Sequence, residues 1–213
     1  NNANLAENEP LPNYSVSNHS KADQIMDVAE SMIRLGGFHA FSFRDIAKEV
    51  GLKSASVHYH FPTKEDLGAA VMKRYGERTL EALGTINDFD ESDWEGFVQH
   101  FIGIVYNAFS NDQKLCLCGM LAAESLKLPT AVVVEVVASV EGLLKRLEEA
   151  LYEAGWTSDR ALARRGASYV FSSLEGAMMM SVLMAKDEPL QAVSELVIES
   201  LRSLGEKNRQ AAS

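Results

Sequence analysis

Residues 43–61 read FRDIAKEVGLKSASVHYHF, and this stretch decides how the N-terminal part of the chain folds. Its first half carries apolar side chains at helical spacing up to Gly51, namely Ile46, Ala47 and Val50. A glycine at that point permits the sharp turn that ends one short helix and starts the next. Leu52 and Val57 would then point back toward Ile46 and Val50. The stretch therefore predicts two short helices, the second over residues 54–60, joined by a tight turn.

The outward side of the second helix is polar, and small residues stand near its start. Small side chains would let this end approach base edges in the major groove of DNA. Hydrogen-bond donors and positive charge around it suit phosphate oxygens, although an ordinary helical hairpin with a polar face has the same features. Lys64 begins the next helix, whose unpaired N–H groups also favour an anion. The candidate DNA-contacting residues are Ser42, Arg44, Lys53, Ser54, Ser56, His58, Tyr59, His60 and Lys64.

Capping signals mark helices along the whole chain. Ser20, Ser42 and Thr63 are each followed three residues later by aspartate, and Ser92 is followed by Glu95, which is the capping-box pattern. Longer helices are expected over residues 92–109, 112–125, 130–154, 158–185 and 189–205. The sequence contains no hairpin turn signal and no alternating strand pattern. The predicted fold class is all-α.

The charge is unevenly distributed along the chain. A formal net charge of −10 at first argues against a nucleic-acid partner. Residues 21–75, however, hold eight basic and seven acidic side chains, so nearly all the excess negative charge lies elsewhere. This distribution suits a protein that presents one end to DNA. No apolar run is long enough to span a bilayer, and two cysteines are too few for a disulfide framework, so we expect a cytoplasmic protein without a membrane partner.

Residues 24–72 resemble the DNA-binding domain of the TetR (tetracycline-repressor) family of transcriptional regulators. The matching features are Ile46-Ala47, Gly51-Leu52, Tyr59-His60-Phe61 and Lys64-Glu65-Asp66-Leu67. One departure is His58, which stands where the family usually has tyrosine. The resemblance implies a regulator and not an enzyme: a homodimer that binds a double-stranded DNA operator and responds to a small-molecule effector, most simply as a repressor. It implies no cofactor.

The resemblance and the helix lengths together predict the domain organisation. The first three helices are short and the later ones long. We expect a helix-turn-helix DNA-binding domain at residues 20–66 and a helical ligand-sensing and dimerisation domain at residues 67–205. Residues 1–19 lack lysine, arginine and the apolar centre of a signal peptide, so they are interpreted as a mobile arm. Residues 206–213 are interpreted as a tail.

In the TetR family the last two helices usually pair with those of a second copy. A stripe of small residues over 163–181 would permit such close packing, although the same stripe could pack within one chain. The stripe comprises Ala163, Gly166, Ala167, Val170, Ser173, Ala177 and Ser181, and the partner face of the final helix comprises Val193, Leu196, Val197, Ser200, Leu201 and Leu204.

A pocket for a small, largely apolar effector would lie among the fourth to eighth helices. Aromatic residues and methionines at helical spacing are more often core than pocket lining. No spacing of His, Asp or Glu is typical of metal ligands, and no glycine-rich loop would hold a phosphate. The candidate ligand-binding residues are Phe97, His100, Phe101, Met120, Glu124, Tyr169, Phe171 and Met179.

Cys116 and Cys118 lie in an apolar stretch within the helix expected over residues 112–125. Two residues apart on a helix they would project about 200° from each other, so they could not readily form a disulfide. Buried packing is the favoured interpretation, and thiol sensing near the helix start is the alternative. Two other functions stay open. One is a helical enzyme with a cysteine nucleophile, and the other is an adaptor that has lost DNA binding.

Overall fold

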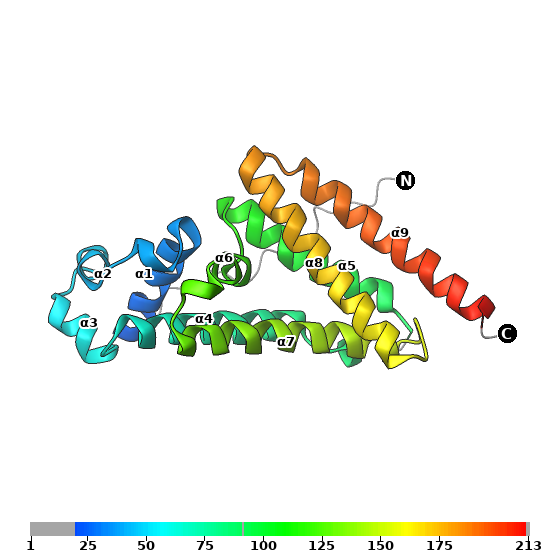
Figure 1. Cartoon of the computed structure of the whole chain (residues 1–213), viewed down its shortest axis with the longest axis horizontal. Coiled ribbons are helices and arrows are strands. Elements are labelled where there is room, and N and C mark those ends of the chain that lie inside the picture. The colour runs from blue at the N-terminus through cyan, green and yellow to red at the C-terminus, as the bar shows by residue number, and fades with distance from the viewer. Residues whose placement is uncertain (1–19, 91, 212–213) are drawn as a thin grey trace. The chain divides into compact units, whose positions relative to one another are not determined.

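A computed structural model describes residues 20–90 and 92–211, and within them the chain forms helices and turns without any strand. The predicted all-α fold is confirmed. The arm predicted at residues 1–19 lies outside the described residues. The elements in Figure 1 are α1 (Lys21–Gly36), η1 (Phe38–Ala40), α2 (Phe43–Val50), α3 (Ser54–His60), α4 (Lys64–Leu83), η2 (Ile86–Asp88), α5 (Trp94–Asp112), α6 (Leu117–Ala123), η3 (Ser125–Lys127), α7 (Thr130–Glu153), α8 (Arg160–Met184) and α9 (Glu188–Ala211).

Local capping determines where the first helices begin. In each case a hydroxyl accepts the N–H of an aspartate three residues later, and that aspartate accepts the N–H of the capping residue. The reciprocal pairs are Ser20 with Asp23, Ser42 with Asp45, and Thr63 with Asp66. These three predicted helix starts are confirmed.

Later boundaries differ from the prediction, most clearly at the start of α5, at α6 and at the end of α9. Asp93, and not Ser92, caps α5, because its carboxylate accepts the N–H of Gly96 at 2.7 Å. The helix expected over residues 112–125 is wrong, since Gln113 takes a left-handed conformation with φ of 53° and α6 begins only at Leu117. The last helix continues past residue 205 to Ala211, with Gly205 inside it.

The described residues divide into two compact units. The N-terminal unit comprises residues 20–79 and 114–140, and the C-terminal unit comprises residues 80–113 and 141–211, apart from residue 91. The N-terminal unit is larger than the head predicted at residues 20–66, because it also holds most of α4, all of α6 and the first part of α7. Contacts between segments far apart in the sequence produce this division, and no local pattern indicates them.

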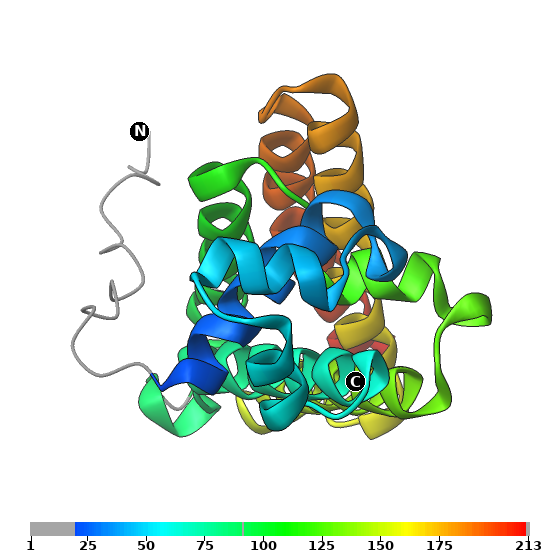
Figure 2. The same ribbon diagram turned by 90° about the vertical axis from the view of Figure 1, so that its left-hand side faces the viewer.

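Helix α1 forms the centre of the N-terminal unit. Its apolar face, with Ile25, Ala29 and Ile33 fully buried, packs against α2 and α6. Figure 2 faces α2 and α3, the two short helices coloured light blue to cyan. Ion pairs between α1 and α4 add to this packing. Arg74 lies 2.7 Å from Asp27, and Arg78 lies 2.8 Å from Glu30.

The C-terminal unit is organised around Trp156, which follows α7. Its side chain is 1% exposed, and the indole Nε1 donates a hydrogen bond to the Leu201 carbonyl at 2.8 Å. Two glycines allow this packing. A Cβ at Gly166 of α8 would lie 3.1 Å from the indole Cζ3, and a Cβ at Gly205 of α9 would lie 2.9 Å from its Nε1. Trp156 thus packs against both α8 and α9 in the core of this unit.

The small-residue stripe of α8 faces this interior and not a second copy. Ala163, Ala167 and Val170 are fully buried within one chain, so the dimer seam predicted along residues 163–181 is wrong. The alternative holds, because the small side chains let α8 approach α9 and Trp156 closely. On α9, Val197 and Leu201 are buried in the same core, whereas Leu196 and Leu204 are among the exposed residues.

Within the described residues, α8 has the length and mean hydropathy (1.2) that a membrane-spanning helix needs. A single such helix is weak evidence, since core helices pass the same test. The buried stripe of α8 belongs to the core of the C-terminal unit.

Candidate DNA-binding surface

The turn between α2 and α3 is built as the sequence predicts. Gly51 is left-handed, with φ of 72° and ψ of 32°, a conformation that side chains with a Cβ seldom adopt. Its neighbour Leu52 donates a backbone hydrogen bond to the Ala47 carbonyl at 2.8 Å, which closes the end of α2. Ile46 and Val57 are both fully buried and hold the two helices together. Ile46 and Val57 are therefore core residues as predicted, whereas Val50 and Leu52, the other two members of the predicted short core, are half-buried.

Most of the predicted DNA-contacting residues lie on the outer side of this pair of helices. Exposed are Arg44, Lys53, Ser54, His58, Tyr59 and His60, while Ser56 is half-buried. Tyr59 is 85% exposed, so its ring and hydroxyl are open to solvent. Lys53 occupies the N-cap position of α3, and its side chain makes no capping hydrogen bond to that helix.

A surface hollow of about 370 Å³ lies beside α3. Its lining comprises Lys21, Leu52, Lys53, Ala55, Ser56, Tyr59 and His60. Lys21 comes from the start of α1 and adds a second positive charge next to Lys53. Sequence reasoning missed Lys21, because no local signal places a residue some thirty positions earlier beside α3.

His58, which departs from the family pattern, has its side chain in contact with residues of its own unit. Its Nδ1 lies 3.4 Å from the Pro62 carbonyl oxygen, and its ring packs edge-on against Phe43 at a centroid distance of 4.6 Å. Tyr59 and His60 contact each other in a similar edge-on way, at 5.4 Å. Tyr59 and His60 therefore belong to the lining of the hollow, whereas His58 contacts the α2 side and the α3–α4 turn.

Two residues predicted to contact phosphates, Lys64 and Ser42, form hydrogen bonds within the protein. The Lys64 ammonium donates a hydrogen bond to the Phe41 carbonyl at 2.6 Å and lies 4.3 Å from the centroid of the Phe41 ring. Burial lowers the pKa of Lys64, while the charge of Glu124 acts in the opposite direction. The Ser42 hydroxyl is bonded to the Asp45 carboxylate at 2.5 Å. Lys64 thus links α4 to η1, and Ser42 caps α2.

Phe97, Phe101 and Phe171, three of the predicted ligand-binding residues, lie on α5 and α8 in the C-terminal unit, and we call them the aromatic cluster. The Phe97 ring packs edge-on against Phe89 at a centroid distance of 5.2 Å. Phe97 and Phe101 on α5 are buried, with at most 2% exposure. The Phe101 ring stacks on that of Phe171, which is half-buried on α8, at a centroid distance of 6.5 Å. His100 lies nearby in the sequence, but its Nε2 is 2.8 Å from the Ala82 carbonyl oxygen at the end of α4. The structure thus gives His100 an intramolecular hydrogen-bond partner.

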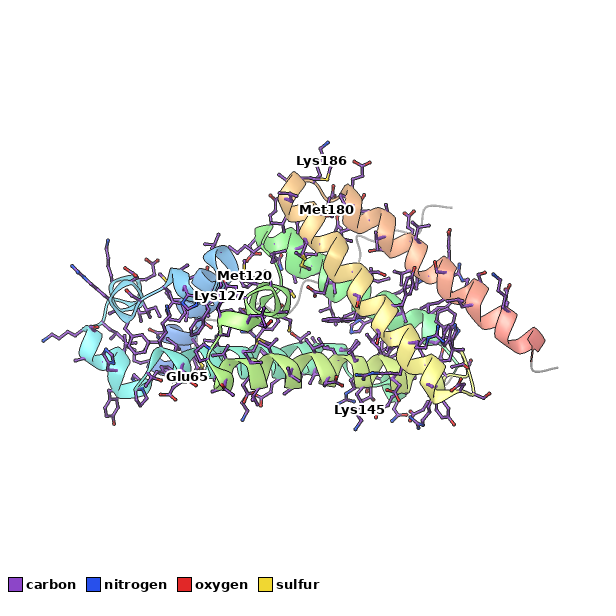
Figure 3. The ribbon with its side chains drawn as sticks, viewed as in Figure 1. Glu65, Met120, Lys127, Lys145, Met180 and Lys186 are labelled. Carbon is purple, nitrogen blue, oxygen red and sulfur yellow. The ribbon has the colours of Figure 1, made fainter. Side chains whose placement is uncertain are left out.

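The other predicted ligand-binding residues are not part of that cluster. Tyr169 and Met179 are exposed on α8, and the Tyr169 hydroxyl donates to Ser200 Oγ at 3.2 Å. Met120, labelled on α6 in Figure 3, belongs to the N-terminal unit. Glu124 follows α6 in the same unit, and its carboxylate accepts the backbone N–H of Phe38.

The two cysteines lie at the start of α6 and not inside a longer helix. Cys116 is the N-cap residue, and its Sγ accepts the N–H of Gly119 at 3.0 Å. Cys116 is 7% exposed and Cys118 is 3% exposed. This burial supports packing as their role, and the thiol of Cys116 also caps the helix. Thiol sensing stays a prediction.

Taken together, the α2–Gly51–α3 pair, its small and polar outward residues, and the cations Lys21, Lys53 and Arg44 define a helix-turn-helix DNA-binding protein. Comparison with known proteins identifies the family. Residues 25–71 match the family "Bacterial regulatory proteins, tetR family", and residues 95–196 match "Transcriptional regulator LmrA/YxaF-like, C-terminal domain". Together these segments span more than half of the chain, and the chain belongs to the TetR family of bacterial transcriptional regulators. This family is a class of regulators and not of enzymes, which excludes the cysteine-nucleophile alternative.

Relatives and solved structures agree with this assignment over most of the chain. The uncharacterized HTH-type transcriptional regulator YxaF of Bacillus subtilis (strain 168) is 25% identical over 86% of this chain and 96% of its own length. The HTH-type transcriptional regulator LmrA of the same organism is 24% identical over 84% and 96%. Among solved structures, a TetR regulator from Legionella pneumophila has a TM-score of 0.81 at 28% identity, covering 86% of this chain and 98% of that one. A TetR-family regulator from Agrobacterium tumefaciens has a TM-score of 0.75 at 27% identity, covering 84% and 96%.

Proposed function

We propose that this regulator is a homodimeric, cytoplasmic repressor that binds a double-stranded DNA operator and leaves it when a small, largely apolar effector binds. The observation that carries the proposal is the exposed face of α3 with its hollow. Lys53, Lys21 and Arg44 would contact phosphates, while Ser54 and Ser56 are small enough to let the helix approach base edges. Tyr59 and His60 offer hydrogen-bond donors at the other end of the hollow.

Selection from a pool of random DNA duplexes tests the DNA-binding part of this proposal. The wild-type protein is expected to enrich one sequence motif, arranged as two related half-sites whose centres lie about one helical turn, or a multiple of it, apart. This arrangement would follow from a twofold symmetric dimer. A single unpaired half-site, or no enrichment, would argue for a different assembly or for an adaptor without DNA binding.

Exposed apolar side chains on α8 and α9 support the dimer. Leu183 is 78% exposed, and neighbouring residues on these helices are also open to solvent. Figure 3 labels Met180 on α8, near the end of that helix. The exposed set comprises Tyr169, Met179, Met180, Leu183, Met184, Leu196 and Leu204. Apolar surface of this kind is typical of a protein interface. The proposed dimer face therefore lies on the opposite side of α8 from the small-residue stripe.

Replacing Leu183 by glutamate is expected to weaken the dimer by about 100-fold or more. Burying a leucine side chain stabilises an interface by roughly 1.5–3 kcal/mol, and this contribution is lost when the side chain is replaced. A twofold axis brings two copies of the change into one interface. Sedimentation velocity over a dilution series measures the dissociation constant. Leu126→Glu is the matched control, since Leu126 is fully exposed on η3 and lies on neither α8 nor α9. Equal dimer stability in the two variants would place the dimer interface elsewhere.

The aromatic cluster of Phe97, Phe101 and Phe171 supports an apolar effector. We expect small apolar compounds that bind at this cluster to raise the unfolding free energy, by about 2.7 kcal/mol at 100 times their Kd, and to release DNA. Thermal unfolding identifies binders, and fluorescence anisotropy with the selected duplex measures release. Phe171→Trp adds volume at the cluster and should reduce this response without changing DNA affinity in the absence of effector. Binders that leave DNA affinity unchanged would count against the repressor mechanism.

A further inference from the structure

Three polar contacts tie the segment between α5 and α7 to the end of α1 and to η1, all within the N-terminal unit. The Arg34 Nε donates to the Leu115 carbonyl at 2.8 Å, and the Lys114 ammonium donates to the Ser31 hydroxyl at 3.1 Å. In the third contact, the backbone N–H of Phe38 donates to Oε2 of Glu124 at 2.8 Å. Because α6 and η3 flank Glu124, this residue connects the α6–η3 corner to the helix-turn-helix.

The backbone at Gly37 is shaped to receive the Glu124 carboxylate. Gly37 has φ of 83° and ψ of 177°, a conformation that residues with a Cβ rarely adopt. A Cβ on Gly37 would overlap Oε1 of Glu124 and lie 2.7 Å from its Cδ. The carboxylate therefore rests against bare backbone, where it can reach the Phe38 N–H directly. A charged acceptor makes this a strong hydrogen bond.

Lys64 holds the other end of η1. Its ammonium bonds to the carbonyl of Phe41, the residue that directly follows η1, and lies 5.2 Å from the centroid of the Phe38 ring. Glu124 and Lys64 also attract each other electrostatically. The short segment from Phe38 to Phe41 is thus fixed at its first residue by Glu124 and at its last by Lys64. The next residue along the chain, Ser42, caps α2.

We propose that Glu124 is a positioning residue for DNA binding. By holding the Phe38 N–H, it sets the direction in which η1 leaves α1 and therefore the place at which α2 and α3 begin. Glu124 does not line the hollow beside α3, so it acts on DNA affinity through η1 and not by contact. This role rests on the DNA-binding function of the family and is independent of the proposed effector.

Two conservative variants separate the hydrogen bond from the charge. Glu124→Gln keeps an acceptor oxygen at the same reach but loses the charge. Glu124→Asp keeps the charge but is one methylene shorter, so its carboxylate no longer reaches the Phe38 N–H. We expect Glu124→Asp to bind the duplex selected by the wild-type protein roughly tenfold more weakly and Glu124→Gln to stay within about threefold of wild type. Amide hydrogen exchange at Phe38 should be faster in Glu124→Asp alone.

Glu77→Asp is the matched control, because Glu77 is exposed on α4 in the same unit. Affinity for a duplex of unrelated sequence and the thermal unfolding temperature complete the experiment. The positioning role is supported if Glu124→Asp loses affinity for the selected duplex alone. Its affinity for unrelated DNA and its unfolding temperature should then stay close to wild type. Wild-type specific affinity in Glu124→Asp despite faster exchange at Phe38 would overturn it. Equal loss on specific and unrelated DNA, or equal loss in Glu124→Gln and Glu124→Asp, would do so as well.

Discussion

Replacement of Lys53 by glutamate is expected to reduce the affinity for the selected DNA duplex by roughly 100-fold, about 2.7 kcal/mol. Lys53 is exposed at the N-cap of α3 and lines the hollow beside that helix, where a phosphate would meet both its ammonium and the helix N-terminus. The charge reversal removes one cation and adds repulsion. The slope of the logarithm of affinity against the logarithm of salt concentration should therefore become shallower by at least about one unit.

Lys127→Glu serves as the matched control. Lys127 is an exposed lysine of η3 in the same compact unit, it is labelled in Figure 3, and it is absent from the hollow. The same change of net charge at this position should alter affinity by only a few-fold, through the long-range field. Similar losses in the two variants would mean that overall charge, and not contact at α3, governs DNA binding.

Replacement of Trp156 by alanine is expected to lower the free energy of unfolding by about 3–5 kcal/mol. The indole is 1% exposed, bonded to the Leu201 carbonyl and enclosed by Gly166 and Gly205. Removing it leaves a cavity where α8 and α9 are fixed together and deletes the hydrogen bond from the indole to α9. Urea unfolding followed by circular dichroism measures the loss. The dimer should weaken in parallel if, as proposed, these helices form its interface.

Trp156→Phe separates the ring from the hydrogen bond. Phenylalanine keeps most of the apolar contact and loses the Nε1 donor, so we expect a smaller loss, of about 1–3 kcal/mol. The same substitution at Trp94 offers a comparison, because Trp94 is half-buried and its ring centroid lies 6.4 Å from that of Trp156. An unfolding free energy for Trp156→Ala within about 1 kcal/mol of wild type would show that the core of the C-terminal unit does not depend on this residue.

Features that depend on neighbours in the sequence could be predicted from it. The pairs Ser20–Asp23 and Thr63–Asp66 announce helix starts because both members of a capping box lie within one turn. Gly51 announces the tight turn for the same reason, since the left-handed conformation is a property of that residue and its immediate neighbours. The helix-turn-helix and its exposed face could therefore be recognised from one segment of chain.

Features that depend on distant segments could not be predicted. The sequence predicts Lys64 to be an exposed cation at a helix start, but in the structure its ammonium contacts the Phe38 ring and the Phe41 ring and carbonyl. Glu124 looks like the polar member of an apolar pocket, and its true partner is a backbone N–H 86 residues earlier. The small-residue stripe of α8 predicts close packing but does not indicate which element packs there. In the structure, Trp156 packs against this stripe at Gly166.

The most direct test of the central claim is the affinity of the wild-type protein for the selected duplex and for a shuffled duplex of the same composition, measured over a series of salt concentrations. A TetR-family regulator with the DNA-binding surface described here should bind the selected duplex at least about 1,000-fold more tightly. The logarithm of its affinity should fall linearly with the logarithm of salt concentration, as phosphate contacts require. Equal affinity for the two duplexes, or no binding even at low salt, would contradict the account and favour an adaptor that has lost DNA binding.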